Sequence, residues 1–481
     1  MEALLAPDRW LIVVTFFSSL LIFTGIGAVS AIHRKHTTKD YLLTGRSMPA
    51  WLVALSAVAT LNSGFMFVGQ IGLTYRVGLS SLWWLVGWAV GDLIAWLFVY
   101  PKLRRLSEEH DEISVLALVA PRRAAGRNLI LSLLALLSVF YLATYAAAQL
   151  KAGSTALESI FGMPASTGAV LGGVIVVIYC YAGGIRASIW TDAAQSVAMF
   201  GSMAVLAVVA SLHVGGPGAL MPALATIGPE LPQLWPADLH FGFGIYLLGM
   251  VFGGLGVIGQ PHILVRSMTI DDPAHLGRAR LYYFLWLIPF YAMAIWVGLH
   301  ARVILPDLMS TSVLGSEHAL PLLSIELLPD VLIGLMLAGL FSATMSTADS
   351  QIIACTSAVT QDLEPRWSSS YAIAKLATLV FTAIALLIAL SSRSGVFELV
   401  LDAWAVLSCT LGPLLVVRLL GLPCTQGMGM ILVAAGLAVS HFWLSSDYAS
   451  ATYVNFPGMV AVFALYAVLL GVRWVRRSGS G

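Results

Sequence analysis

The chain has 481 residues, of which 59% are hydrophobic and only 10% are charged, and its formal net charge is +1. Soluble domains usually carry about a quarter charged residues, so this composition excludes an ordinary soluble protein. It predicts an all-α integral membrane protein in which the apolar part is the fold itself. A net charge so close to zero gives no sign of a nucleic-acid partner.

Apolar runs of about 20 residues, the length that crosses a bilayer, recur along the chain. They predict a single transmembrane domain over 1–481 with about 13 membrane-spanning helices. We place these spans at 10–32, 50–75, 79–100, 127–153, 160–182, 187–212, 240–264, 279–304, 325–360, 370–392, 395–419, 427–445 and 453–474.

The positive charges predict an orientation. Lys and Arg gather in alternate connections, for example Lys39 and Arg46 after the first span and Lys102, Arg104 and Arg105 after the third. Loops that stay inside carry this excess. The pattern therefore predicts an N-terminus outside and a C-terminus inside.

Two of the predicted spans are interrupted. The second reads "ALSAVATLNSGFMFVGQIG" and the seventh reads "GMVFGGLGVIGQPHIL". Glycine costs about 1 kcal/mol in a helix interior, and unwound backbone survives in a membrane only where it lines a cavity or is buried in protein. Close helix packing through small residues is the alternative explanation for the seventh span.

The two interruptions lie five spans apart, as expected for matching positions in two inverted repeats of a transporter. Spans two to six form repeat one, at 50–212, and spans seven to eleven form repeat two, at 240–419. One extra helix at 10–32 precedes them, and C-terminal helices at 427–474 follow.

The ninth span carries a dense group of hydroxyls, in "LAGLFSATMSTADSQIIACTSAVTQDL". Ser346 and Thr347 are neighbours, and Asp349 and Ser350 follow one turn later. Sodium prefers oxygen ligands, and such hydroxyls together with carbonyls freed by an unwound helix supply them. Serine and threonine can instead bond back to the preceding turn, but that alternative does not explain a carboxylate at this depth.

Other charged residues also lie within apolar runs. Asp192 near the inner end of span six is either functional or merely solvated. Asp92 and Lys151 can pair or snorkel, and Glu398 and Asp402, four residues apart, can face a vestibule. The sequence leaves the roles of these residues open.

Six stretches in the same order resemble the sodium:solute symporter family, and the bacterial sodium/proline branch most closely. They are "DYLLTGRSMP", "ALSAVATLNSG", "GGIRASIWTDAAQSVAMF", "GQPHILVRSM", "ATMSTADSQ" and "AWAVLSCTLGP". The resemblance implies the five-plus-five inverted-repeat fold of the bacterial leucine transporter.

The resemblance also implies site residues. The main sodium site would take the carbonyl oxygens of Ala59, Asn62 and Ala343 and the side-chain oxygens of Ser346 and Thr347.

A second cation or proton site would take Asp192, Ser346, Asp349 and Ser350. Two carboxylates near one site repel each other, so one of them can hold a proton when no cation is bound.

The solute pocket departs from the proline branch. That branch has an acid where this chain has Leu61, and an aromatic pair where it has Gly253 and Val257, whereas Tyr145 matches. A pocket widened on that side suits a bulkier amino acid or another small organic solute. The residues expected in the pocket are Ser63, Gly64, Tyr145, Gly253, Val257 and Gln260.

The predicted function is a sodium-coupled symporter of a bacterial cytoplasmic membrane that imports a small organic solute, an amino acid or related carboxylate, by alternating access. Sodium is the coupling ion, no organic cofactor is expected, and the oligomeric state is open. The alternatives are a proton-coupled carrier on the same fold and a solute sensor acting with a signalling partner. The chain has no GxxxxGK phosphate-binding loop, and we expect no enzymatic activity.

Overall fold

The computed structural model describes residues 10–32, 35, 37–120, 128–310, 313–392 and 394–478. Within these ranges the chain is helical, with one isolated β-bridge between Met48 and Ile270. This confirms the predicted all-α class.

The described residues contain eleven helical stretches that are long and apolar enough to cross a membrane. One stretch, Ala50–Glu109, holds two of the predicted spans, and the predicted span at 160–182 contains only the shorter apolar helix Ser166–Ile178. The count of thirteen therefore stays a prediction.

The first half of the chain consists of ten helices within the described residues. They are α1 (Trp10–Ala31), α2 (Thr38–Leu43), α3 (Ala50–Phe65), α4 (Ile71–Val77), α5 (Leu82–Phe98), α6 (Tyr100–Glu109), α7 (Val115–Val119), α8 (Leu129–Phe161), α9 (Ala165–Val214) and α10 (Leu220–Ile227).

The second half adds nine more in the part of the chain that the structure describes. They are α11 (Gly242–Leu255), α12 (Pro261–Thr269), α13 (Leu276–Ile304), α14 (Ala319–Leu327), α15 (Asp330–Ser357), α16 (Tyr371–Ser391), α17 (Val396–Leu419), α18 (Gln426–Leu444) and α19 (Asn455–Ser478).

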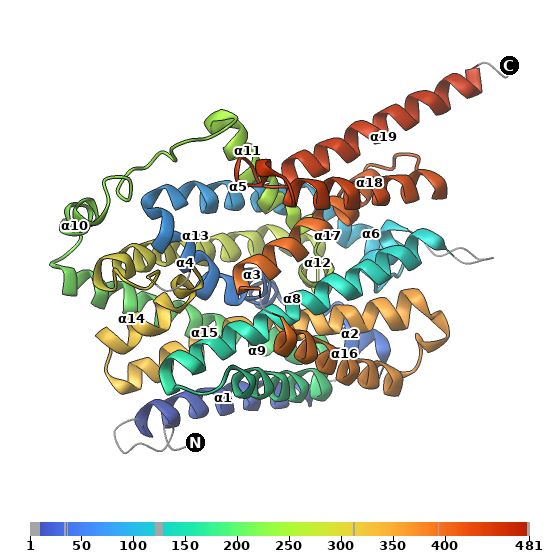
Figure 1. Ribbon diagram of the computed structural model, residues 1–481. Coiled ribbons are helices and arrows are strands. Elements are labelled where there is room, and N and C mark those ends of the chain that lie inside the picture. Colours follow the sequence, from blue (N-terminus) through green and yellow to red (C-terminus); the bar gives the residue numbers. More distant parts are fainter. Residues whose placement is uncertain are drawn as a thin grey trace.

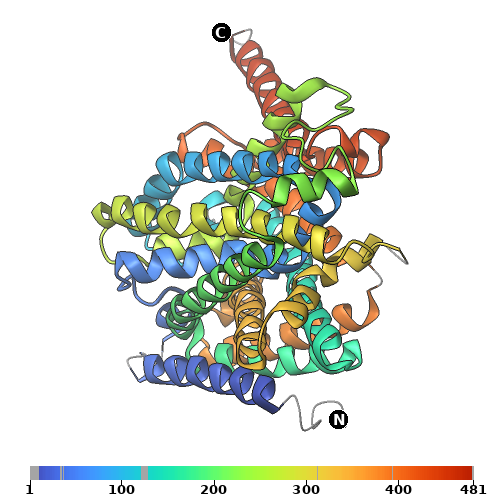
Figure 2. The same cartoon turned by 90° about the vertical axis from the view of Figure 1, so that its left-hand side faces the viewer.

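The hydroxyl-rich helix α15 forms the centre of the molecule. It packs against α1, α3, α8 and α9, and its residues from Met336 to Ile353 are buried throughout. In its most apolar window 83% of the residues are buried, against 22% in α19. Both views place α1 and α19 at opposite edges of the bundle (Figures 1 and 2). Polar residues of α15 are therefore buried in protein and do not face lipid.

Both predicted interruptions are present. Helix α3 contains Ser63 with φ 51° and ψ −178°, and a wide π-type turn follows at Met66–Gln70. Helix α11 ends at Leu255 and passes through a tight turn at Gly256–Gly259. Extended Gln260 then precedes Pro261, which begins α12.

The alternative explanation for the seventh span, close helix packing, also holds in part. A Cβ atom on Gly254 would lie 1.9 Å from the carbonyl oxygen of Trp88, and a Cβ on Gly91 would lie 2.0 Å from that of Val251. Helices α5 and α11 therefore approach each other through two glycines, directly beside the interruption.

The basic residues near the start of the chain form ion pairs at one end of the bundle. Arg186 contacts Asp40 at 2.6 Å, and Asp111 contacts Lys39 at 2.6 Å and Arg46 at 3.1 Å. Asp111 lies after α6, outside the membrane-spanning stretch, and hydrogen bonds from Lys39 and Arg46 hold the pKa of its carboxyl below the ordinary value. These pairs link α2 and the turn after it to α9 and to the segment after α6.

Glu317 caps a helix at the other end of the bundle. Its carboxylate accepts the backbone N–H groups of Val396 at 3.2 Å and Phe397 at 3.0 Å, at the start of α17, and its side chain is buried. We expect Glu317→Ala to lower the free energy of unfolding by about 1–2 kcal/mol because two helix donors lose their acceptor. Glu317→Gln keeps one acceptor oxygen and should lose less. Thermal unfolding of the purified protein measures both, and equal stability of all three chains would contradict the capping role.

Candidate functional site

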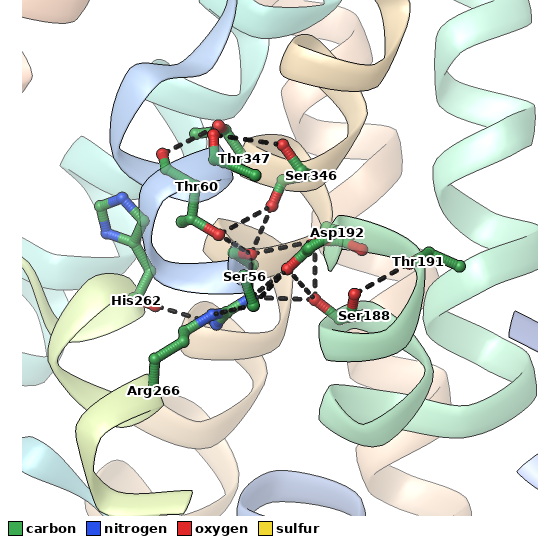
Figure 3. Close-up of polar contacts among 12 residues, drawn as sticks. Ser56, Thr60, Ser188, Thr191, Asp192, His262, Arg266, Ser346 and Thr347 are labelled. Carbon is green, nitrogen blue, oxygen red and sulfur yellow. Dashed lines mark hydrogen bonds and ion pairs between the residues drawn. The ribbon is translucent and has the colours of Figure 1, made fainter. Parts of the chain in front are cut away.

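The hydroxyls of α15 face the interrupted part of α3. Ser346 Oγ donates to the carbonyl oxygens of Ala343 at 3.1 Å and Ala59 at 3.4 Å. Thr347 Oγ1 donates to those of Ala343 at 3.1 Å and Thr60 at 3.0 Å. Figure 3 shows Ser346 and Thr347 pointing from α15 toward the α3 backbone. All of these groups are buried.

Four of the five residues predicted for the main sodium site therefore lie together. The fifth, Asn62, donates through its side-chain amide to the carbonyl oxygen of Val58, and its own carbonyl accepts the N–H of Met66. The carbonyl of Thr60, which the sequence did not single out, joins the group instead.

The chemistry of this group fits a sodium ion. Two hydroxyl oxygens and three carbonyl oxygens lie within hydrogen-bond distance of one another, and a hydroxyl can turn a lone pair toward a cation. The hydroxyls now donate to these carbonyls, so a bound ion would replace those hydrogen bonds with coordination. No charged side chain is needed among these ligands.

The buried guanidinium of Arg266 lies within the predicted second cation site. It donates to Ser188 Oγ at 2.9 Å and Asp192 Oδ2 at 3.3 Å, and it also contacts Ser350 Oγ. Its remaining nitrogens reach Ser56 Oγ at 3.4 Å and the carbonyl oxygen of His262 at 2.9 Å. Figure 3 shows Arg266 approaching Asp192 and Ser188 from α12. Because guanidinium is always charged, the chain itself supplies a cation here.

The second carboxyl group, Asp349, lies in the same cluster. Ser188 Oγ is 3.3 Å from the Asp192 carboxylate and 3.1 Å from that of Asp349, and Ser350 Oγ is 3.0 Å from Asp349. Asp192 thus contacts the guanidinium directly, and Asp349 is linked to it through Ser188 and Ser350. If both are ionised, this cluster carries one excess negative charge, which one further cation or proton balances.

The acid cluster touches the predicted sodium site directly. Thr60 Oγ1 lies 3.4 Å from Ser350 Oγ, and also 3.4 Å from the Ser346 carbonyl oxygen. Ser350 Oγ donates to that same carbonyl at 2.5 Å. A cation bound by Ser346 and Thr347 would therefore lie beside Ser350, which itself contacts the carboxyl group of Asp349.

Three of the residues predicted for the solute pocket meet at the α3 interruption. The N–H of Gly64 donates to Gln149 Oε1 at 2.8 Å, and the buried hydroxyl of Tyr145 interacts with Ser63. Tyr145 also lines a cavity of about 20 Å³, which has room for about one water molecule.

The predicted widening of the pocket at Gly253 is wrong. A Cβ atom on Gly253 would lie 3.1 Å from the ring of Tyr453 and 3.5 Å from the ring of Trp88. Aromatic side chains from α5 and from the segment before α19 thus occupy the space beside Gly253.

The other two predicted pocket residues pack into the protein. Val257 is fully buried, and Gln260 Nε2 donates to the Trp404 carbonyl oxygen at 3.1 Å and lies 3.3 Å from Ser408 Oγ. Gln260 thereby links the interrupted seventh span to α17.

The remaining intramembrane charges occupy three different places. Asp92 is fully buried in α5 near Tyr283, and neither of its carboxyl oxygens has a hydrogen-bond partner among the described residues. Lys151 donates to the carbonyl oxygens of Ser392, at 3.2 Å, and Ser394. Glu398 and Asp402 line a large cavity of about 740 Å³.

Sequence reasoning missed Arg266 and the tryptophans around the small cavity. Arg266 stands in the quoted stretch "GQPHILVRSM", where a basic residue beside an interrupted span was an available signal. Trp84 and Trp88 lie in "LWWLVGW", where tryptophan is typical of a membrane interface, so the sequence offered no sign that they line a cavity.

Comparison with known proteins agrees with this arrangement. The model of the sodium:solute symporter family matches residues 41–427. Among curated relatives, the osmoregulated proline transporter OpuE of Bacillus subtilis is 29% identical over 89% of this chain and 88% of its own. The high-affinity proline transporter PutP of the same organism is 27% identical over 90% and 92%.

Two solved structures share the fold. A substrate-bound, outward-open Na+-coupled sialic acid symporter superposes with a TM-score of 0.77 at 20% identity, covering 95% of this chain and 96% of its own. The nucleobase-cation symporter MHP1 gives 0.56 at 16% identity, over 91% and 95%. The all-helical fold, the paired interruptions and the extent of the family match lead to one conclusion: the chain belongs to the sodium:solute symporter family.

Proposed function

We propose that this chain uses a sodium gradient to import a small organic solute, an amino acid or related carboxylate, by alternating access. The observation that carries the proposal is the convergence of Ser346 and Thr347 on carbonyl oxygens at the α3 interruption. The proline transporters among the relatives and the sialic acid symporter among the similar structures support this class of solute.

Coupling follows from the position of the site. Sodium bound between α3 and α15 holds these two helices together and also balances the excess charge of Asp192 and Asp349 against Arg266. The same interruption of α3 supplies Ser63 and Gly64 to the solute side. Sodium should therefore tighten solute binding, and solute should tighten sodium binding by the same factor.

The proposed architecture has two inverted repeats at 50–212 and 240–419, with 10–32 before them and 427–474 after. We place the end that carries the Asp40 and Asp111 ion pairs in the cytoplasm of a bacterium and the end that carries Glu398 and Asp402 outside. The first residue of α1 and the last turn of α19 lie at opposite ends of the bundle (Figure 1), which supports an N-terminus outside and a C-terminus inside.

Uptake into proteoliposomes tests the proposal. A panel of labelled amino acids and carboxylates is offered with an inward sodium gradient, and a matched potassium gradient is the control. Sodium-dependent accumulation of one solute is the expected result. Accumulation that is driven equally well by a proton gradient in potassium would show that sodium is not the coupling ion.

A proton is the second candidate for coupling, because two carboxyl groups face one guanidinium. We expect Asp349→Asn to keep sodium-driven uptake but to flatten its dependence on pH, since one fewer acid then competes for the excess charge. Initial uptake rates across a pH series measure this. A pH profile identical to that of the unmodified chain would remove Asp349 from any proton step.

A further inference from the structure

A further cavity lies at the end of the bundle that carries the Asp40 and Asp111 ion pairs. It has a volume of about 500 Å³ and lies between the start of α8, the end of α17 and the connection from α17 to α18. Val119, the last residue of α7, also lines it, and α7 begins shortly after Asp111. The residues assigned above to sodium and solute do not line this inner cavity, so it is separate from both sites.

The inner cavity has one guanidinium and no acid among its described lining residues. Arg418, in the last turn of α17, donates from Nε to the carbonyl oxygen of Leu118 at 3.3 Å. This contact anchors one side of the guanidinium. The two terminal nitrogens form no hydrogen bond or ion pair with the residues that the structure describes. Arginine presents these nitrogens as a fork that matches the oxygens of a phosphate.

Two helix N-termini add to the positive potential around Arg418. Asn128 caps α8 and Thr425 caps α18, each through a side-chain oxygen that accepts a backbone N–H at 3.3 Å. Asn128 and the first residue of α18 line the cavity, and the dipole of a helix makes its N-terminus positive. At the end of α17, two carbonyl oxygens are already bonded to the N–H groups of Gly421 and Leu422. The potential in the inner cavity therefore favours an anion.

Exposed leucines lie beside the inner cavity. Leu129 begins α8 and is 54% exposed, and Leu420 and Leu422 follow α17 and are 54% and 41% exposed. Leu422 also lines the cavity itself. Exposed apolar side chains at the end of a span meet lipid chains, and a cluster of them marks a contact surface. An anion bound at Arg418 thus has apolar surface directly next to it.

We propose that the inner cavity binds the headgroup of an anionic phospholipid, with its phosphate on the guanidinium of Arg418 and its acyl chains against Leu129 and Leu420. The orientation proposed above places the cavity in the cytoplasmic leaflet, where anionic lipids gather and basic pockets between helices bind their headgroups. Its volume is that of a small-molecule site. A free phosphate offers the same oxygens but leaves the leucines uncovered.

The thiol of Cys424 reports whether the inner cavity is occupied. Cys424 lines the cavity and is exposed, whereas Cys355 and Cys409 are buried. The full chain is placed in phosphatidylcholine vesicles with or without phosphatidylglycerol of the same acyl chains. Alkylation of Cys424 by N-ethylmaleimide is followed by peptide mass spectrometry. We expect phosphatidylglycerol to slow alkylation by on the order of five- to tenfold, because charge-assisted hydrogen bonds favour the occupied site by about that factor.

Arginine variants separate binding from the charge of the vesicle surface. An anionic surface gathers protons and so lowers the thiolate fraction everywhere. Arg418→Gln should keep only this general effect, and Arg418→Lys, which retains the charge without the fork, should be intermediate. Arg105→Gln removes an exposed arginine of α6 that does not line the cavity, and it should behave like the unmodified chain. Equal slowing in the unmodified chain and in both Arg418 variants would overturn the proposal.

Inorganic phosphate distinguishes the two sources of the anion. Added to phosphatidylcholine vesicles at millimolar concentration, it should leave the alkylation of Cys424 unchanged. If it slows alkylation as much as phosphatidylglycerol does, the lipid assignment is wrong and the cavity takes a free anion. If neither slows alkylation, the cavity is not an anion site. These measurements need no transport, so their failure is distinct from failure of the symporter proposal.

Discussion

Replacing Ser346 and Thr347 together by alanine is expected to abolish sodium-driven uptake at ordinary sodium concentrations. Among the described residues of α3 and α15, these two hydroxyls are the side-chain oxygens that hydrogen-bond to the predicted carbonyl ligands. Those carbonyls belong to Ala59, Thr60 and Ala343. If each ligand contributes about 1–1.5 kcal/mol, their loss weakens sodium binding by on the order of 30- to 100-fold. The sodium concentration that gives half-maximal uptake measures this change.

Ser342→Ala is the matched control for this experiment. Ser342 lies one turn earlier on α15, is fully buried, and its hydroxyl has no hydrogen-bond partner among the described residues. Its removal should leave the sodium dependence unchanged. Equal weakening in the control and in the double variant would mean that the loss arises from disturbed packing of α15 and not from lost ligands.

Arg266→Gln should have the second large effect, on stability as well as on transport. The guanidinium is completely buried, and it is the one basic group that contacts Asp192 within the described structure. Removing one partner of a buried ion pair typically costs about 3–5 kcal/mol, because the other charge is left uncompensated. We expect a clear fall in the temperature of thermal unfolding and no measurable sodium-driven uptake.

A second substitution separates charge from packing. In the Arg266→Gln chain, adding Asp192→Asn removes a carboxylate that has lost its counter-charge, so stability should partly recover. Arg278→Gln, at an exposed position of α13, is the control and should change the free energy of unfolding by less than about 0.5 kcal/mol. An Arg266→Gln chain as stable as the unmodified one would contradict the role of Arg266 as an internal cation.

The sequence by itself determined the membrane class, the interrupted second and seventh spans and the hydroxyl pair of the ninth. These features are local. Long apolar runs predict spans, Asn62, Ser63 and Gly64 are poor helix formers within one of them, and Ser346 with Thr347 places adjacent oxygens at one depth. Each of these features can be recognised from one helix alone, without knowing which helix packs against it. The reason is that exposing backbone or polar groups to lipid is costly at every position of a span.

Only the tertiary structure decided which groups meet. Arg266 reaches Asp192 and Ser350 because α12, α9 and α15 converge after the seventh span unwinds, and no sequence spacing encodes that convergence. In the same way, Trp88 and Tyr453 cover Gly253 from distant parts of the chain, which reversed the expected widening of the pocket. The charge of the second site and the shape of the solute site depend on contacts between residues far apart in sequence. A pattern within one helix cannot specify them.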